Sequence, residues 1–198
     1  ALASNTTGAS NVAVGREALV SNTTASNNTA VGYQAGYSNT TGDFNTFVGR
    51  QSGDAVTTGA QNTFLGSDAG SSTTTSNYNT AVGKSSMFYN TTGASNTALG
   101  VSALQSNTTS SNNTAVGYQA LLANTTGTGN SILGSNAGDA LTTGSYSTAM
   151  GQNALSTATT STHNTAIGQS ALFLTTTGTY NTGIGASALY SNTTASNN

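Results

Sequence analysis

The chain has 198 residues, of which three are basic and five acidic, and it contains 24 glycines, no proline and no cysteine. A charged fraction of 4% lies far below the roughly 25% of ordinary soluble domains, which excludes a nucleic-acid-binding surface and a charge-steered substrate funnel. The absence of cysteine excludes a disulfide scaffold and a thiolate metal site, and no apolar run approaches the roughly 20 residues of a transmembrane helix.

A seventeen-residue repeat, without insertion or deletion, runs through the whole chain. In chain order it is marked by glycines at Gly15, Gly32, Gly49, Gly66, Gly83, Gly100, Gly117, Gly134, Gly151, Gly168 and Gly185. Each glycine closes a block such as Asn28–Gly32, and a Thr-Thr pair such as Thr40–Thr41 begins eight residues after it. Numbered from the asparagine, the cycle reads Asn, Thr, Ala, Val, Gly, variable, polar, Ala, Leu, variable, Ser, Asn, Thr, Thr, Gly, variable, variable.

One such cycle is too short for a helix-turn-helix repeat, and the apolar places do not recur with the 3.6-residue period of a helix. Thr, Val and Ala between Gly-rich and Asn-rich corners favour short strands and turns. The sequence therefore predicts an all-β fold, a parallel β-solenoid or β-roll with one coil for each cycle, forming part of a fibre. Coils about 4.8 Å apart would span roughly 55 Å.

Residues 1–198 are predicted to form a single repeat array of about 11.6 coils. A longer period of five cycles is also present, because Ser26–Ala35 and Ser111–Ala120 have the same sequence. It indicates duplication of a five-coil block, with a true five-coil structural repeat as the alternative. Both ends stop within a cycle and are uncapped, so we expect either flanking repeats or subunits that abut end to end.

The fourth place of the cycle always carries an aliphatic residue or methionine, and we expect this column to form the core. Its members are Val14, Val31, Val48, Leu65, Val82, Leu99, Val116, Leu133, Met150, Ile167 and Ile184. The ninth place is most often Leu, but some coils have glycine there, among them those with Gly53 and Gly138. Since Val56 and Leu141 occupy the twelfth place of these two coils, we expect the apolar group to move along the coil and fill the same space. Asparagine at every first place except Ser147 predicts a ladder of side-chain amides along the stack.

We predict no catalytic residue, no cofactor and no metal site, and hence no enzyme. His163 is the only histidine and occupies the variable seventeenth place, where no partner for a catalytic base recurs. A calcium-binding β-roll needs a Gly-Gly-x-Gly-x-Asp pattern, and none is present. Asp54 and Asp139 follow glycines at a corner and are interpreted as turn residues.

Two surface features carry alternative interpretations. Arg16, Arg50 and Lys84 share the sixth place, which predicts a solvated ridge that protects the edge, or an anion-binding stripe. Aromatic residues at variable places predict contacts between chains, or a platform for sugars. They are Tyr33, Tyr37, Phe44, Tyr78, Phe88, Tyr118, Tyr146, Phe173, Tyr180 and Tyr190.

Asn-x-Ser/Thr sequences make nine asparagines candidate sites of glycan attachment. Seven share the twelfth place, namely Asn5, Asn22, Asn39, Asn90, Asn107, Asn124 and Asn192, and the other two are Asn27 and Asn112. One column of acceptors would cover a single edge with glycan. The alternative is that Asn-Thr-Thr serves only as a turn and ladder motif.

The Thr-Thr columns suggest a further hypothesis, an ice-binding solenoid, because regular arrays of hydroxyl and methyl groups can order water. Adjacent threonines point to opposite faces of a strand, however, so only one of each pair could join an outward array.

The blocks Asn28-Thr29-Ala30-Val31-Gly32 and Ser21-Asn22-Thr23-Thr24 resemble repeats in bacterial and phage tail-fibre-like surface proteins. More distantly, they are similar to head repeats of trimeric autotransporter adhesins. This resemblance implies an extracellular fibre, on a cell surface or a virion appendage, whose partners are copies of the same chain in a homotrimer or an end-to-end filament.

Together these features predict a non-catalytic structural module, a rigid shaft that sets distance and presents a surface. The alternatives are a carbohydrate-binding adhesin or receptor-binding tail-fibre segment, with cell-surface glycans as partners, and an N-glycosylated filament. Neither nucleic acid nor membrane insertion is expected.

Overall fold

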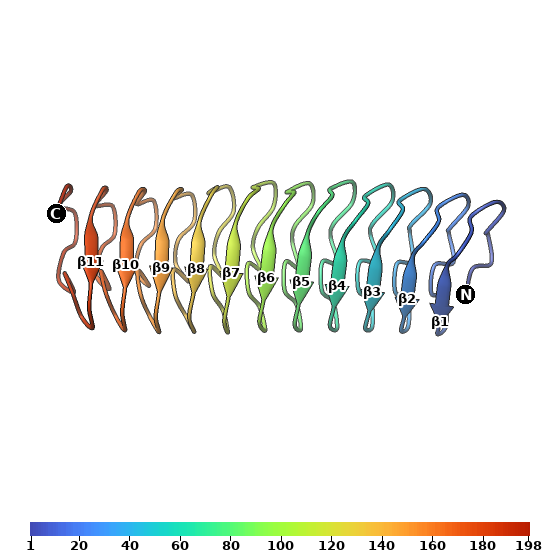
Figure 1. Cartoon of the computed structure of the whole chain (residues 1–198), viewed down its shortest axis with the longest axis horizontal. Coiled ribbons are helices and arrows are strands. Elements are labelled where there is room, and N and C mark those ends of the chain that lie inside the picture. The colour runs from blue at the N-terminus through green and yellow to red at the C-terminus, as the bar shows by residue number, and fades with distance from the viewer.

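The computed structural model describes residues 1–198 as a β-solenoid of eleven short parallel strands and no helix (Figure 1). The strands are β1 (Val12–Val14), β2 (Thr29–Val31), β3 (Thr46–Val48), β4 (Thr63–Leu65), β5 (Thr80–Val82), β6 (Thr97–Leu99), β7 (Thr114–Val116), β8 (Ser131–Leu133), β9 (Thr148–Met150), β10 (Thr165–Ile167) and β11 (Thr182–Ile184). The predicted all-β solenoid is confirmed.

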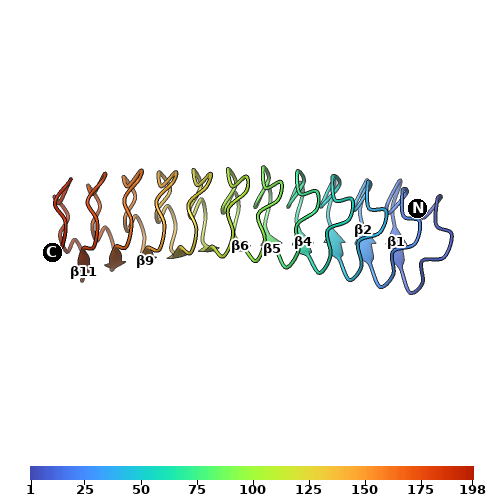
Figure 2. The ribbon, with the colours of Figure 1, turned by 90° about the horizontal axis from the view of Figure 1, so that it is seen from above.

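Each strand pairs in parallel with the next strand along the chain, in a register offset by one whole cycle that places Thr46 beside Thr63. The rest of each coil consists of turns on the other side of the stack (Figure 2). These turns are also bonded from coil to coil, as where the Leu104 N–H donates to the Ala120 carbonyl at 3.0 Å. Most of the 108 backbone hydrogen bonds outside the strand ladders join one coil to the next, so the coils are bonded around their whole circumference.

The core is a narrow, filled column of mostly small and medium side chains along the solenoid axis. It is built from the third, eighth and ninth places, as in Ala98, Ala103 and Leu104 of one coil, all of which are fully buried. Successive residues of a strand point to opposite faces, so a buried third place requires the second and fourth places to point outward.

The predicted core column at the fourth place is therefore wrong. None of its members is buried: Val14, Val31, Val48, Leu65, Val82, Leu99, Val116, Leu133, Met150, Ile167 and Ile184 are half-buried or exposed. Val14 is 57% exposed and Ile184 67%. The physical reason is space, because so short a coil leaves room for alanine and one leucine but not for a second bulky row.

In three of the four coils with glycine at the ninth place, a larger residue at the third place fills the space, and in the fourth, Gly36 lies against Phe47 of the next coil. Phe64 lies against Gly70, and Phe47 lies against Gly53; a Cβ added to either glycine would approach the ring to within 2.4–2.5 Å. The expected shift of apolar volume to the twelfth place also occurs, since Val56 is fully buried. Core volume is thus exchanged between places of the same coil.

Two asparagine ladders run along the stack, and both are buried. At the first place, the Asn45 side-chain oxygen accepts from the Asn62 backbone N–H at 2.9 Å, while its amide group donates to the Gly59 carbonyl at 2.8 Å. The predicted ladder is confirmed, with backbone groups as its main partners. At the twelfth place the amides bond to each other, as where Asn107 Nδ2 donates to Asn90 Oδ1 at 2.7 Å.

The twelfth-place ladder stops wherever an apolar residue replaces asparagine. Val56 follows Asn39 in this column, and Leu141 follows Asn124. Neither side chain can donate a hydrogen bond, so the buried Oδ1 atoms of Asn39 and Asn124 have no partner. The ladder therefore ends with an unsatisfied acceptor at both places.

Candidate functional site

The solenoid offers no enclosed site. Its surface has no pocket, and no group of three or more His, Asp or Glu side chains gathers in one place. A helix capable of spanning a membrane is absent from the structure. Candidate functional groups are therefore those on the outer surface, where equivalent residues of successive coils form columns.

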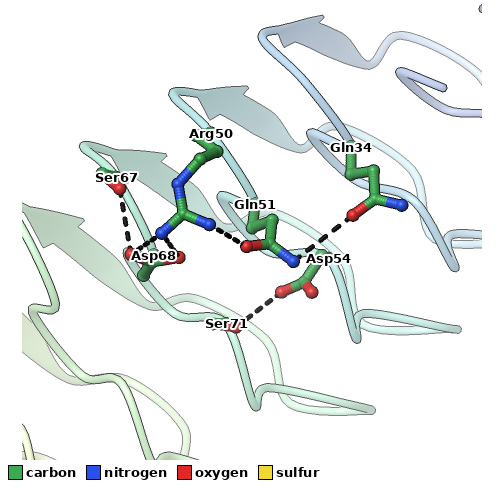
Figure 3. Close-up of polar contacts among 7 residues, drawn as sticks. All are labelled: Gln34, Arg50, Gln51, Asp54, Ser67, Asp68 and Ser71. Carbon is green, nitrogen blue, oxygen red and sulfur yellow. Dashed lines mark hydrogen bonds and ion pairs between the residues drawn. The ribbon is translucent and has the colours of Figure 1, made fainter. Parts of the chain in front are cut away.

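A polar cluster lies at the corner that follows β2, β3 and β4, and its residues come from the sixth, seventh and tenth places (Figure 3). The guanidinium of Arg50 spans one coil and binds both carboxylate oxygens of Asp68, at 2.6 and 2.8 Å. Ser67 donates to the same carboxylate at 2.9 Å. Gln51 accepts from Arg50 and donates to Gln34 at 3.3 Å. This cluster satisfies its own charges and leaves no free cation.

The sixth-place ridge accordingly has little capacity for an anion. Arg50 is paired with Asp68, and the Arg16 side chain lies 3.5 Å from the Glu17 carboxylate and 5.8 Å from the Tyr33 ring centroid. Only Lys84 makes no ion pair. Two of the three cations are thus neutralised within the chain, which favours the solvated-ridge interpretation over an anion-binding stripe.

The surroundings of Asp54 change its titration. Its carboxylate accepts from the Ser71 hydroxyl of the next coil at 2.6 Å, as shown in Figure 3. Burial raises the pKa of the Asp54 carboxyl, and the hydrogen bond from Ser71 lowers it by less. The same contact recurs five coils later, where Ser156 donates to Asp139 at 2.5 Å. These two corner residues therefore tie neighbouring coils together as well as forming turns.

The raised pKa of Asp54 makes stability depend on pH in the acid range. The folded chain prefers the protonated carboxyl, so the contribution of Asp54 to the free energy of unfolding is complete below the unfolded pKa of about 3.9. This contribution is lost as the pH rises through the folded pKa. Asp54→Asn should remove that loss and raise the urea midpoint at neutral pH relative to the wild type. Ser71→Ala should move the loss to higher pH. Parallel midpoint-against-pH curves for the wild type and Asp54→Asn would contradict this assignment.

Four of the ten predicted aromatic residues lie in two short ladders, and the ten do not form one platform. Tyr146, His163 and Tyr180 follow one another at the seventeenth place, with ring centroids 5.2 and 4.7 Å apart. Phe173 and Tyr190 stack at the tenth place, 5.1 Å apart. As predicted, His163 is exposed. Since stacked rings cover each other's faces, the ladders present mainly ring edges to solvent, whereas a sugar stacks on a ring face.

The predicted column of glycan acceptors is not available on the folded chain. Asn22, Asn39, Asn90, Asn107 and Asn124 are fully buried, and each donates its amide hydrogens to neighbouring acceptors. A glycan on such an amide would displace the ladder. Asn5 and Asn192 are half-buried in the end coils, and their amides donate to Gly8 and Ala195. Only Asn27 and Asn112 are exposed.

The two threonines of each Thr-Thr pair have different roles. The first hydroxyl of most pairs donates to a backbone carbonyl of the next coil, as from Thr91 to Thr108 at 2.9 Å. The second threonine, such as Thr92, is exposed in every coil. The pairs therefore supply only one row of outward hydroxyls, which is not the two-dimensional array that the ice-binding hypothesis assumed for them.

The surface that sequence reasoning missed is the outer face of the sheet. It carries the second-place and fourth-place side chains of all eleven strands, including exposed Leu99 and Thr97 of β6. The sequence did contain an indication of this face. In the alternation Thr-Ala-Val, the small middle residue is the one that fits a narrow interior, so its two neighbours point outward. Comparison with known protein families, curated proteins and solved structures gave no match.

Proposed function

We propose that this chain is a non-catalytic structural module of an extracellular fibre, a shaft that sets distance and presents a surface. The observation that carries the proposal is the unbroken coil-to-coil hydrogen bonding around the whole circumference. Such a stack grows only along its axis, and each coil contacts only its two neighbours. The resemblance to tail-fibre-like repeats supports a place outside the cell, on a cell surface or a virion.

A shaft should lengthen in proportion to the number of its coils. Inserting one additional five-cycle block, Asn28–Asn112, after Asn112 keeps the register and adds five coils. Small-angle X-ray scattering should then show a rod longer by about 24 Å with an unchanged cross-section. A matched insertion of Asn28–Asn107 stops short of a whole cycle, so it breaks the register and should not give this rod. An isotropic increase in size for the in-register insertion would reject the shaft.

The adhesin alternative has one surface feature in its favour, the exposed ladder of Tyr146, His163 and Tyr180. A glycan array distinguishes the two functions. Binding that is lost in Tyr180→Ala, and retained in Tyr78→Ala, would favour the adhesin; no binding by a chain that forms rods favours the shaft. Glycosylation would be restricted to Asn27 and Asn112, and an intact mass of 19.5 kDa would exclude it.

A further inference from the structure

Beside its row of second-place residues, most of which are threonines, the outer face of the sheet carries the one outward column of side chains that is apolar along the whole solenoid. We use the name apolar row for the fourth-place residues of β1–β11, which run from Val14 to Ile184. Seven of the eleven are more than a third exposed, with Leu65, Leu99 and Leu133 at 44–46%. Figure 1 shows the strands side by side along this face.

No charge interrupts the apolar row. All eight charged residues occupy the sixth, seventh, tenth or sixteenth places, and none lies in a strand. Other exposed hydrophobic side chains, such as Val101 and Tyr118, share columns with polar or charged residues. Scattered apolar residues need no explanation on a protein surface, but a continuous apolar strip of this length indicates a contact.

Between β4 and β8 the apolar row is not level, and its relief has a period of two coils. From β4 to β8 it reads Leu65, Val82, Leu99, Val116 and Leu133. The leucines are exposed and the valines between them are half-buried, so knobs about 9.6 Å apart alternate with hollows. A flat lattice such as ice would meet only the knobs. A second apolar row shifted by one coil would place its leucines over the valines, as facing layers do when large and small side chains interdigitate.

The face is also large enough for a contact between proteins. Eleven strands make it about 50 Å long, and three residues of strand make it about 10 Å wide, or on the order of 500 Å² per chain. Two such faces would bury on the order of 1,000 Å², which is near the lower limit for a specific interface. An uncharged face can meet its own copy without like-charge repulsion.

We infer that a second copy of this chain packs lengthwise on the outer face of the sheet, with the leucines of one apolar row over the valines of the other. The two chains run antiparallel, so that a two-fold axis across the strip relates them and the contact is isologous. This inference rests on the proposed shaft function and adds its partner: shafts associate side by side through their sheets.

The test is the mass of the full chain in solution, with two substitutions at neighbouring outward places. Sedimentation equilibrium over a dilution series should give a particle of at least twice 19.5 kDa. Leu99→Lys places a charge at the centre of the apolar row and should return the particle to a single chain. Val101→Lys is the matched control: Val101 is 44% exposed, and its column already carries Lys84, so association should persist.

A second variant keeps the test free of charge effects. Leu65→Val/Leu99→Val/Leu133→Val levels the apolar row and should weaken association at least tenfold while the circular dichroism spectrum stays unchanged. A single chain throughout the dilution series, or an assembly that Leu99→Lys leaves intact, overturns the inference. Since the shaft proposal is judged by rod length and this one by mass, the two can fail separately.

Discussion

Gly100→Ala is expected to destabilise the solenoid by about 3 kcal/mol, because the fifth-place glycine combines a disfavoured backbone conformation with a close approach to the next coil. Its φ of +140° is a conformation that side chains strongly disfavour, and an added Cβ would lie 2.3 Å from the Gly117 carbonyl oxygen. That oxygen belongs to the next coil, so relief of the clash requires the two coils to separate. Urea unfolding followed by circular dichroism should show an earlier transition, and a second transition where the stack divides at β6.

The matched control is Gly93→Ser, at the fifteenth place of the cycle. An added Cβ there would also approach the next coil closely, at the Ser110 carbonyl oxygen, but Gly93 has no positive φ. The neighbouring coils carry Ser76 and Ser110 at this place, so the stack can accommodate a side chain by a small shift. This substitution should change the midpoint much less than Gly100→Ala does. Equal effects at the two glycines would show that the backbone conformation of the fifth place is not decisive.

The glycine period also explains why so much of the fold could be predicted from sequence. A residue that must approach the backbone of the next coil has to recur once per coil, and Gly15 to Gly185 recur once in every cycle. The first-place asparagine must recur for the same reason, since its side chain bonds to the next coil. Contacts between equivalent residues therefore leave a period in the sequence, and from this period the solenoid and its ladder could be predicted.

The period does not by itself decide whether a given place points inward or outward. Val31 is bulkier than Ala30, and hydrophobicity alone assigned Val31 to the core, whereas Ala30 is the buried residue. The deciding quantity is the width of the interior, which depends on how the coil turns at residues such as Gln34, with a φ of +55°. Corner geometry of this kind is a property of the folded coil, and polar residues at the seventh place do not specify it by themselves.

The burial of glycan candidates such as Asn22 could not be predicted for a related reason. Asn22 and Asn27 both belong to Asn-x-Ser/Thr sequences, yet one is fully buried and the other exposed. The difference lies in the partner: the Asn22 amide donates at 2.7 Å to Oδ1 of Asn5, the equivalent residue of the preceding coil. A ladder and a modification motif use the same residues, so only the geometry of the neighbouring coil separates them.

The second large effect concerns Phe64 and Gly70, which exchange volume within one coil. Phe64→Ala alone should cost about 3–5 kcal/mol, because a fully buried ring is replaced by a cavity. Gly70→Leu alone should also destabilise, since a Cβ at residue 70 would lie 2.5 Å from the Phe64 ring. The double variant recreates the pair Ala98 and Leu104, in which Leu104 is fully buried at a φ of +52°.

Phe64→Ala/Gly70→Leu should therefore be more stable than either single variant, with a coupling free energy of about 3 kcal/mol in a double-mutant cycle measured by urea unfolding. Phe64→Ala/Gly83→Leu is the control, since Gly83 is a fifth-place glycine that a side chain cannot replace, and no recovery is expected. Additive effects in the first pair would mean that Phe64 and the ninth place do not share one space. Recovery would show that the third and ninth places fill one shared space, because the backbone bonds to the neighbouring coils hold this coil at one width.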